Sequence, residues 1–332
     1  MGVKTSDIHT NTQLSVYNCS INNHIKDMKV LIATEKPFAP AAVEGIRKEI
    51  ESAGNDLILL EKYTDGSQLL EAVSNVDAMI VRSDKITPEV LDAAKSLKIV
   101  VRAGAGYDSI DTNYAKEKNI IVENTPGQNS NAVAELVFGL LVYAVRNFYN
   151  GKAGTELKDK KLGILAFGNV GRNVARIAQG FGMDVYAYDA YCPVEAIEST
   201  GVHAVKSQDE LFQTCDILSL HIPATAETKG SIDYRTVNQL SEGAILINTA
   251  RKEVINEPEL IQLLAERTDL KYITDIKPDA DSEFRQFEGR YFSTPKKMGA
   301  QTEEANTNAG IAAAKQINAF FKDGCTKFQV NK

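Results

Sequence analysis

Cysteine is scarce in this chain of 332 residues, and its few copies lie far apart. Cys19, Cys192, Cys215 and Cys325 form no C-x-x-C pair. The sequence therefore indicates neither a zinc site nor a disulfide framework, and we expect no metal centre. Scattered thiols are typical of a reducing compartment, so the sequence favours a cytoplasmic protein.

Basic tracts and long apolar runs are also missing. The net charge is −7, which argues against a nucleic-acid or membrane-surface role. The most apolar stretch, Ala132 to Val145, contains Glu135 and is too short to span a bilayer. Its apolar positions recur at helical spacing and predict a deeply buried helix, which Asn129 and Ser130 can cap.

The N-terminal segment, residues 1–27, differs from the rest of the chain. It is rich in Asn, Thr and Ser and lacks the apolar core of a signal peptide. A regular strand pattern begins only after Met28. We therefore expect residues 1–27 to be a disordered leader, or to lie upstream of a true start at Met28.

Beyond Met28, short β-rich runs alternate with helical stretches in two series. Parallel strands joined by helices bury both faces of their sheet, so the pattern predicts an α/β fold with two doubly wound parallel-sheet domains. The first series of predicted strands is Val30–Ala33, Leu57–Leu60, Ala78–Val81, Ile99–Val101 and Ile120–Val122. The second is Leu162–Leu165, Val185–Tyr188, Ile217–Leu220, Ala244–Ile247 and Tyr272–Thr274.

A long helical stretch, Glu303 to Phe321, follows the last predicted strand and needs a surface on which to pack. A return to the first domain is plausible from its position. The expected division is therefore a discontinuous first domain of residues 28–124 and 303–332, and a second domain of residues 125–302.

The first strand of the second series leads into a glycine-containing turn, Ala166-x-Gly168-x-x-Gly171. Gly168 would let the backbone approach a pyrophosphate, Gly171 would let helix and strand pack closely, and the helix N-terminus would face the phosphates. Asp189 directly follows the next predicted strand, where a carboxylate accepts hydrogen bonds from a ribose 2′-hydroxyl and repels a 2′-phosphate. The unit predicts a Rossmann domain that prefers NAD. Ala replaces the usual first Gly, which requires a negative φ at Ala166.

Several ordered motifs resemble those of the D-2-hydroxyacid dehydrogenase family, and among its subgroups the phosphoglycerate dehydrogenases. The resemblance covers nearly everything after Met28, and its motifs are Val81–Ser83, Val101–Asp108, Asn124–Asn129, Leu220–Pro223, Asn248–Arg251 and Thr274–Asp275. It implies a flavodoxin-like substrate domain beside the Rossmann domain, and a homodimer formed through the buried helix region.

The resemblance also implies a role for each matched residue. Arg251 would bind the substrate carboxylate, for which a planar guanidinium is suited. The other substrate contacts would be Arg82, Ser83, Arg102, Gly104, Ala105, Gly106 and Asn129. The arginines suit a phosphorylated substrate, so replacing Arg82 should impair only phosphorylated substrates, although ordinary interdomain ion pairs are the alternative. Asn129 is equally well explained as a helix cap.

The cofactor contacts are implied in the same way. They would be Phe167, Gly168, Asn169, Val170, Gly171, Asp189, His221, Ile222, Pro223, Thr249, Ala250, Asp275 and Gly299. Asp275 would accept a hydrogen bond from the nicotinamide carboxamide. We expect His221 to be a packed or hydrogen-bonded histidine that transfers no proton.

One departure from the family concerns the acid/base. The family usually has a histidine after a Thr-Pro pair, but no histidine follows His221 here. The segment after Thr294 contains two lysines, and alignment from Met298 favours Lys297 while alignment from Thr294 favours Lys296. We prefer Lys297, and the resemblance extends to a lysine-bearing subgroup. The alternative is that both lysines are solvated loop residues.

The glutamate that usually partners the histidine is also missing, since position 280 is Ala. The absence of this glutamate is consistent with a lysine as the base, because a carboxylate beside a lysine would stabilise the ammonium and hinder its use as a base. A free lysine has a pKa near ~10.4, so it needs cationic surroundings to act as a base. We therefore expect substrate oxidation by NAD to be fastest at alkaline pH.

The favoured function is NAD-dependent oxidation of D-3-phosphoglycerate to 3-phosphohydroxypyruvate, the first step of phosphorylated serine biosynthesis. A glyoxylate or hydroxypyruvate reductase is the neighbouring alternative. An NAD-sensing scaffold without catalysis is the alternative from another class, since the histidine and glutamate are both absent. The partners expected are a small 2-hydroxy or 2-oxo acid and a second copy of the chain, with no nucleic acid or membrane.

Overall fold

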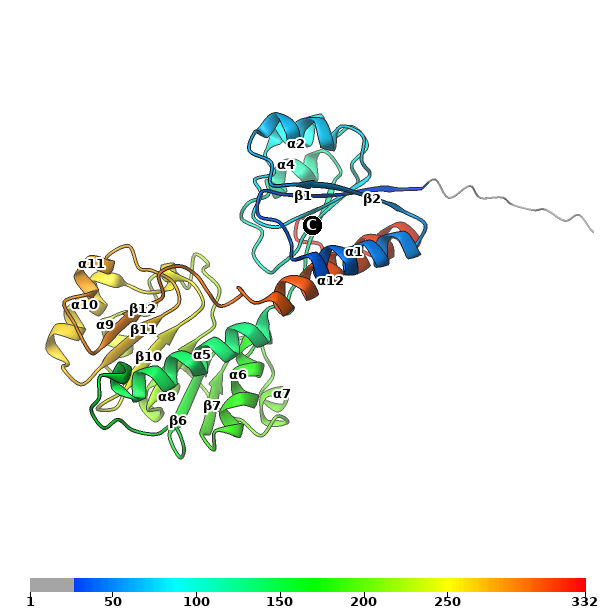
Figure 1. Ribbon diagram of the computed structural model, residues 1–332. Helices are drawn as coiled ribbons and strands as arrows, with labels where there is room; N and C mark the ends of the chain where they lie inside the picture. The colour runs from blue at the N-terminus through cyan, green and yellow to red at the C-terminus, as the bar shows by residue number, and fades with distance from the viewer. Residues whose placement is uncertain (1–26) are drawn as a thin grey trace, which may run out of the picture.

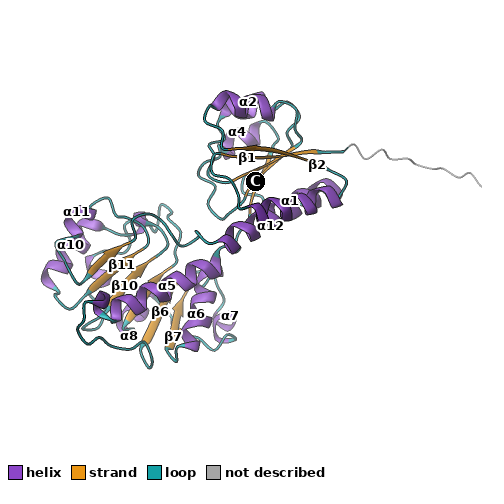
Figure 2. Cartoon of the chain, viewed as in Figure 1, coloured by secondary structure: helices purple, strands orange, loops and turns teal. Residues whose placement is uncertain are grey.

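The computed structural model describes residues 27–332, which fold into two α/β domains (Figure 1). Apart from Asp27, the predicted leader of residues 1–27 lies outside the described residues. Each domain contains one parallel sheet with helices packed on its faces, as the secondary-structure view also shows (Figure 2). The predicted fold class is confirmed.

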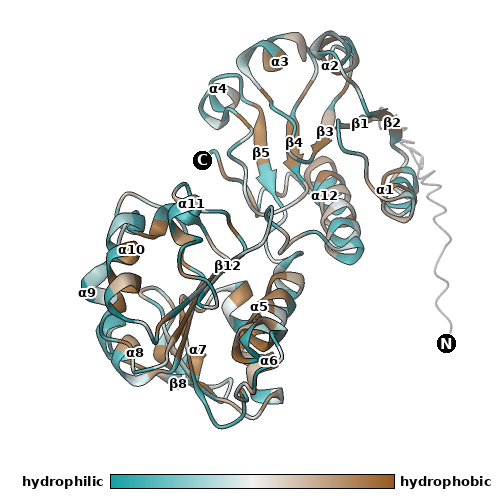
Figure 3. Cartoon of the chain, turned by 60° about the vertical axis from the view of Figure 1, so that its left-hand side comes forward, coloured by the Kyte–Doolittle hydropathy of each residue, from teal (hydrophilic) through white to brown (hydrophobic). Residues whose placement is uncertain are grey.

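The first domain is built on a five-stranded sheet in the order β2-β1-β3-β4-β5. Its central strands are apolar on both faces because helices cover both sides, and Figure 3 shows these strands as hydrophobic. The strands are β1 (Lys29–Thr34), β2 (Asp56–Glu61), β3 (Ala78–Val81), β4 (Ile99–Arg102) and β5 (Ile121–Asn124). The helices are α1 (Pro40–Ser52), α2 (Gly66–Val73), α3 (Pro88–Ala93) and α4 (Thr112–Glu117).

The second domain is built on a seven-stranded sheet in the order β12-β11-β10-β9-β6-β7-β8. The strands are β6 (Lys161–Leu165), β7 (Asp184–Tyr188), β8 (His203–Ala204), β9 (Ile217–Leu220), β10 (Ile245–Asn248), β11 (Lys271–Thr274) and β12 (Tyr291–Ser293). The helices are α5 (Ser130–Val145), α6 (Asn169–Gly180), α7 (Val194–Glu198), α8 (Gln208–Thr214), α9 (Tyr234–Val237), α10 (Glu257–Glu266) and α11 (Asp281–Phe284), with 3₁₀ turns at Asn147–Tyr149 and Lys252–Val254.

The order of this sheet reverses between β6 and β9, which are neighbours although two strands separate them in the chain. In open parallel sheets, ligands bind beyond the carboxyl ends of the strands at such a switch point. The two edge strands, β8 and β12, were not predicted. They are too short for a strand pattern to register.

Helix α5 forms where the apolar run predicts it, and most of its residues are buried. It packs on α6 and β11 and shares an apolar cluster with residues of β6. The expected capping differs. Asn129 occupies the N-cap position, but its side chain accepts no hydrogen bond from the first turn, and no capping bond involves the Ser130 side chain. The capping explanation of Asn129 is therefore wrong, because burial of the apolar face is sufficient to fix this helix end.

The final long helix, α12 (Glu303–Asp323), lies beside α1 on the first domain (Figure 1). Glycines permit the close approach. A Cβ built on Gly45 would lie 2.7 Å from Ile311 Cδ1, and one on Gly310 would lie 2.7 Å from Ile46 Cδ1. The chain thus crosses from the second sheet back to the first. Among residues 27–332, no helix is both long and apolar enough to cross a membrane.

Candidate active site

A cavity of about 320 Å³ lies where loops from the two domains meet. The loops follow the carboxyl ends of β3, β4, β10 and β12, the edge at which parallel sheets place their sites. Its lining residues are Ser83, Arg102, Gly106, Asp108, Ser109, Arg251 and Lys297. Five predicted site residues from distant parts of the sequence are therefore brought together. Asp108 and Ser109 were not predicted, although their position shortly after Gly106 in the same loop is a signal that could have found them.

The cavity is rich in positive charge. Arg102, Arg251 and Lys297 line it, with Asp108 as the one carboxylate in the lining. Burial is the main cause that lowers the pKa of Arg102, and the neighbouring guanidiniums of Arg82 and Arg251 add to it. Arg251 Nη1 donates to the Ala250 carbonyl at 2.8 Å, and no ion pair neutralises Arg251 within residues 27–332. Such a cavity is suited to a substrate that carries negative charge.

The Lys297 side chain is exposed to the open cavity, yet its pKa is lowered from the ordinary lysine value. Desolvation by the surrounding protein is the largest cause, followed by the Arg251 guanidinium. Asp275 and Glu253 act in the opposite direction but do not cancel the effect. Lys296 does not line the cavity. The geometry thus distinguishes the two lysines and places the one with the lowered pKa beside Arg251.

No carboxylate forms an ion pair with Lys297 within the described residues. Ala280 occupies the position where the resemblance implies a glutamate, with its backbone N–H donating to Glu257. The acids on either side are engaged elsewhere, since Asp279 pairs with Lys252 and Asp281 accepts from Arg285 at 2.9 Å. Within residues 27–332, the Lys297 side chain forms no ion pair and has no hydrogen-bonding side-chain partner.

The glycine-rich loop after β4 contributes Gly106, Asp108 and Ser109 to the cavity lining. Gly104 has a φ of +146°, and a Cβ built there would lie 1.4 Å from Arg102 Nη1. The glycine therefore creates the space in which the Arg102 guanidinium lies. Asn124 Nδ2 donates to the Ala105 carbonyl at 2.6 Å, which ties this loop to the chain segment that crosses between the domains.

Arg82 has a different position from that expected of a substrate contact. Its guanidinium donates to the carbonyls of Lys36 and Pro37 and to Asn306 Oδ1, at 2.6 to 3.0 Å, and it lies over the Phe38 ring. It does not line the cavity. Arg82 connects the loop after β1 to α12, and the next residue, Ser83, lines the cavity. Sequence reasoning could not separate these two roles, because both need an arginine at the end of β3.

The glycine turn after β6 has the expected helix-to-strand packing. A Cβ on Gly171 would lie 2.4 Å from the Ala166 carbonyl oxygen, so only glycine allows this approach. Gly168 caps the N-terminus of α6 with open space around it, which suits a phosphate group. One expectation is wrong, since Ala166 has a φ of +76° rather than a negative value. The turn requires the left-handed conformation of the usual glycine even though the residue is alanine.

Asp189 lies at the end of β7 and is held by backbone donors. Its carboxylate accepts from the N–H groups of Phe167, Tyr191 and Cys192 at 2.7 to 2.9 Å. Burial raises the pKa of Asp189, but these three hydrogen bonds and the nearby Arg172 outweigh it, so the net shift is downward. The carboxylate is therefore ionised at neutral pH, as recognition of a ribose diol requires.

The motifs after β9 and β10 flank the switch point. Burial lowers the pKa of His221 to about 3, and its Nε2 lies 2.8 Å from Ser219 Oγ. The ring is thus neutral at physiological pH. Thr249 Oγ1 is buried without a hydrogen-bond partner among residues 27–332, so it is free to bond a polar ligand. These residues fit a dinucleotide laid across the ends of β6, β9 and β10.

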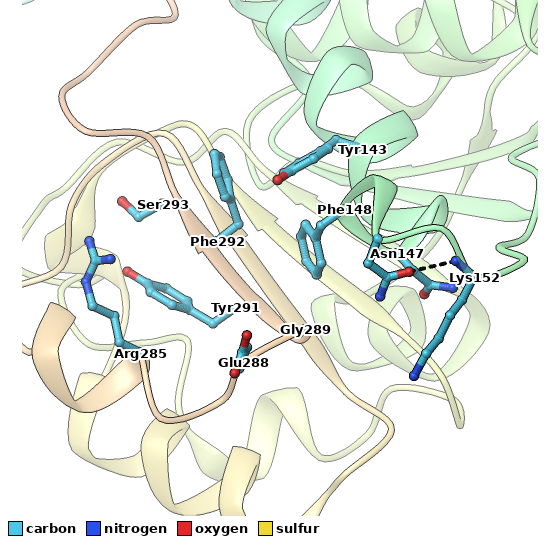
Figure 4. Close-up of a pocket in the computed structure, with 11 residues that line it drawn as sticks. Tyr143, Asn147, Phe148, Lys152, Arg285, Glu288, Gly289, Tyr291, Phe292 and Ser293 are labelled. Carbon is cyan, nitrogen blue, oxygen red and sulfur yellow. Dashed lines mark hydrogen bonds between the residues drawn. The ribbon is translucent and has the colours of Figure 1, made fainter.

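A larger cavity, about 660 Å³, lies away from this site beside the edge strand β12 (Figure 4). The aromatic rings of Tyr143, Phe148, Tyr291 and Phe292 line it together with Arg285. It contains none of the predicted site residues. Size alone therefore does not identify the chemical site, which needs the convergent charges of the smaller cavity.

Together, the switch-point turn, the ionised Asp189 and the interdomain cationic cavity define the class of protein, a two-domain dehydrogenase with an NAD-binding Rossmann domain. Residues 143–293 match the family described as D-isomer specific 2-hydroxyacid dehydrogenase, NAD binding domain. The hydroxypyruvate reductase of Thermotoga maritima is 34% identical over 79% of this chain and 90% of its own length. The chain therefore belongs to the D-isomer specific 2-hydroxyacid dehydrogenase family.

Two further relatives are named as phosphoglycerate dehydrogenases. The D-3-phosphoglycerate dehydrogenase of Methanocaldococcus jannaschii is 35% identical over 80% of this chain and 53% of its own length. The chain thus spans about half the length of several curated relatives that it matches. The crystal structure of NAD⁺-bound 3-phosphoglycerate dehydrogenase from Entamoeba histolytica is 48% identical, with a TM-score of 0.82, and covers 92% of this chain and 99% of that one.

Proposed function

We propose that the protein uses NAD to oxidise D-3-phosphoglycerate to 3-phosphohydroxypyruvate. The observation that carries the proposal is the cavity in which Arg102, Arg251 and Lys297 meet a single carboxylate, Asp108. A substrate with a carboxylate at one end and a phosphate at the other complements this excess of positive charge. The name and 48% identity of the Entamoeba structure support the same substrate.

The proposed chemistry assigns separate tasks to the cavity residues. Arg251 binds the substrate carboxylate in its guanidinium plane, and the backbone of residues 104–106 holds the same group from the other side. Neutral Lys297 accepts the proton of the C2 hydroxyl. NAD, held by the loops after the Rossmann strands, would supply the acceptor for the hydride from C2. In the reverse direction, the Lys297 ammonium donates the proton to the carbonyl oxygen.

The phosphate end is assigned to Arg102 and Ser83, with Ser109 close by in the same lining. Arg82 supports these contacts from behind the cavity through its bonds to the β1 loop and Asn306. Asn129, at the start of α5, remains a proposed substrate or hinge contact.

The proposed cofactor contacts follow the ends of the Rossmann strands. Gly168, Gly171 and the first turn of α6 receive the pyrophosphate, and Asp189 receives the adenosine ribose. Asp275 and Gly299 are proposed for the nicotinamide end. The Asp275 carboxylate is completely buried and accepts from Met298 N and Gly299 N, so it would act there by fixing this backbone. The remaining proposed contacts are Phe167, Asn169, Val170, His221, Ile222, Pro223, Thr249 and Ala250.

A panel of 2-hydroxy acids tests the substrate, with NADH formation as the measurement. Phosphoglycerate should give the highest kcat/KM. Higher turnover of glyoxylate or hydroxypyruvate with NADH would favour the reductase, an alternative supported by the near full-length match to the Thermotoga enzyme. Tight NAD binding without hydride transfer to any 2-oxo acid would instead indicate a scaffold.

The remaining proposals concern organisation. We propose a substrate domain of residues 28–124 and 303–332 and an NAD-binding domain of residues 125–302, supported by the packing of α12 on α1. A homodimer through the α5 region is supported by the exposed aromatic residue Tyr149 in the 3₁₀ turn that follows that helix, and light scattering tests it. Among residues 27–332, the thiols of Cys192, Cys215 and Cys325 are free, which supports our proposal of a cytoplasmic location.

A further inference from the structure

The segment that carries Lys297 is fixed at its start by one buried hydroxyl. Thr294 follows β12 directly and is only 6% exposed. Its Oγ1 lies 2.9 Å from Asp275 Oδ1, 2.8 Å from the Asp275 carbonyl oxygen and 2.8 Å from the Lys296 carbonyl oxygen. A hydroxyl has one hydrogen, so it donates to one of these acceptors at a time. The group nevertheless connects the end of β11 to the residue immediately before Lys297.

The same carboxylate fixes the other end of the segment. Asp275 is completely buried, and it accepts from Met298 N through Oδ1 and from Gly299 N through Oδ2, both at 2.8 Å. A Cβ on Gly299 would lie 3.1 Å from Asp275 Oδ2, so the backbone approaches the carboxylate as closely as it can. The segment 295–297 is thus held at both ends by hydrogen bonds to Asp275, from Thr294 before it and from the backbone of Met298 and Gly299 after it.

Lys297 itself has no hydrogen-bonding side-chain partner in the described part of the chain, and Ala280 offers no carboxylate at the position where the resemblance implies a glutamate. Its position is therefore set by its backbone. We propose that Thr294 is a positioning residue for the reaction, which holds the segment 295–297 against Asp275 so that the Lys297 amine faces the substrate hydroxyl. This inference rests on the proposed role of Lys297 as acid/base.

The arrangement has a consequence for the charge of the lysine. The pKa of Lys297 is low because protein atoms desolvate it and Arg251 and Arg102 lie nearby, while Asp275 and Glu253 favour the ammonium. If the segment loosens, the long side chain can turn towards water and away from the two guanidiniums. Its pKa then returns towards the ordinary value, so that less of the amine is neutral at a given pH.

Thr294→Val is the direct test, because valine keeps the shape of threonine and removes the hydroxyl. We expect kcat to fall at least tenfold, since small displacements of a catalytic group cost large factors in rate. KM should change less than about threefold, because Arg251 and Arg102 remain in place. The pH at which kcat/KM reaches half its maximum should move upward by about one unit. Thr294→Ser keeps the hydroxyl and should restore the rate and the pH profile.

Two further variants separate the possible results. Thr236→Val removes a hydroxyl that is equally buried, in α9, and serves as the control for a general loss of packing. Pro295→Gly loosens the same segment at an exposed residue, so it tests the idea even if Thr294→Val fails to fold. It should lower kcat and move the pH profile in the same direction.

The outcomes distinguish this inference from the proposed function. An inactive Lys297→Ala combined with unchanged pH profiles in folded Thr294→Val and in Pro295→Gly would overturn the positioning role and leave the acid/base role intact. Full activity of Lys297→Ala would overturn both. Asp275→Asn is less informative, because Asp275 is also a proposed cofactor contact and carries a charge that acts on the lysine.

Discussion

The Arg102 guanidinium lies against the backbone of Gly104, where a Cβ atom would come within 1.4 Å of Nη1. The backbone carbonyl of Arg82 fixes the arginine by accepting from its Nε at 3.0 Å. A cationic side chain is thus folded back over its own loop, and the shape of the cavity depends on a residue without a side chain.

Gly104→Ala should therefore disable the site while leaving most of the fold intact. The new methyl group must displace the guanidinium, and a φ of +146° is strained for any L-residue. We expect kcat/KM for phosphoglycerate to fall at least about a hundredfold, mainly through KM, because ground-state binding is lost. Gly66→Ala, in the same domain with open space around it, is the matched control. Equal activity of the two variants would contradict the role given to Gly104.

The left-handed conformation of Ala166 predicts that a substitution there changes stability. Residues with a side chain are destabilised by about 1 to 2 kcal/mol in this conformation. Glycine avoids this cost, but its more flexible unfolded chain offsets part of the gain. Ala166→Gly should raise the free energy of unfolding by roughly 1 kcal/mol, measured by urea denaturation without cofactor. Ala224→Gly, in an exposed loop, is the control and should not stabilise the protein. Destabilisation by Ala166→Gly would show that the turn tolerates alanine without strain.

The lowered pKa of Lys297 gives the rate a defined dependence on pH. In the proposed mechanism, oxidation needs the neutral Lys297 amine, so kcat/KM should rise with pH and level off above the pKa of the free enzyme. Because that pKa lies below the ordinary lysine value, the plateau should begin at a lower pH than an unperturbed lysine allows. The reverse reaction needs the ammonium, so its rate should fall as the pH rises.

Two variants check this dependence in a pH–rate series. Lys297→Ala should lose at least about a hundredfold in kcat, as expected when a general base is removed. Lys296→Ala, which removes the neighbouring side chain outside the cavity, should keep both the rate and the profile. If Lys296→Ala were the inactive variant, the alternative alignment would be right.

Particular residues show what the sequence could predict. Buried strands such as β1 and β10 were predicted because a continuous apolar run persists in any parallel sheet that is covered on both faces. The very short edge strands β8 and β12 were missed because such segments are defined by their neighbours. The sign of φ at Ala166 is likewise set by the packing of α6 against β6, which no local pattern contains.

The site shows the same division between local and tertiary information. Motif residues such as Arg251 and Lys297 were identified by type and order, and the fold brings them to one cavity. The side-chain direction of Arg82 depends on Asn306, which lies in α12 near the other end of the chain. The sequence could place a guanidinium at the end of β3 but could not show which partner it contacts.

The position of Arg82 changes the expectation for its replacement. Its guanidinium makes three hydrogen bonds to protein groups and stacks on Phe38, and it does not line the cavity. We therefore expect it to stabilise the loop around Ser83. Arg82→Gln should lower the free energy of unfolding by about 2 to 3 kcal/mol, because hydrogen bonds from a charged group are lost. It should reduce kcat/KM by similar factors for phosphoglycerate and for unphosphorylated glycerate.

Arg102→Gln provides the contrast, because Arg102 lines the cavity itself. Its kcat/KM should fall at least about tenfold more for phosphoglycerate than for glycerate, since a charge-assisted bond to the phosphate is lost only in the first case. Both variants are compared in one series, with thermal unfolding measured in parallel. If Arg82→Gln proved selective for the phosphorylated substrate and unchanged in stability, Arg82 would have to leave Asn306 and turn into the cavity during the reaction. The substrate-bound enzyme would then differ from this structure where the end of β3 contacts α12.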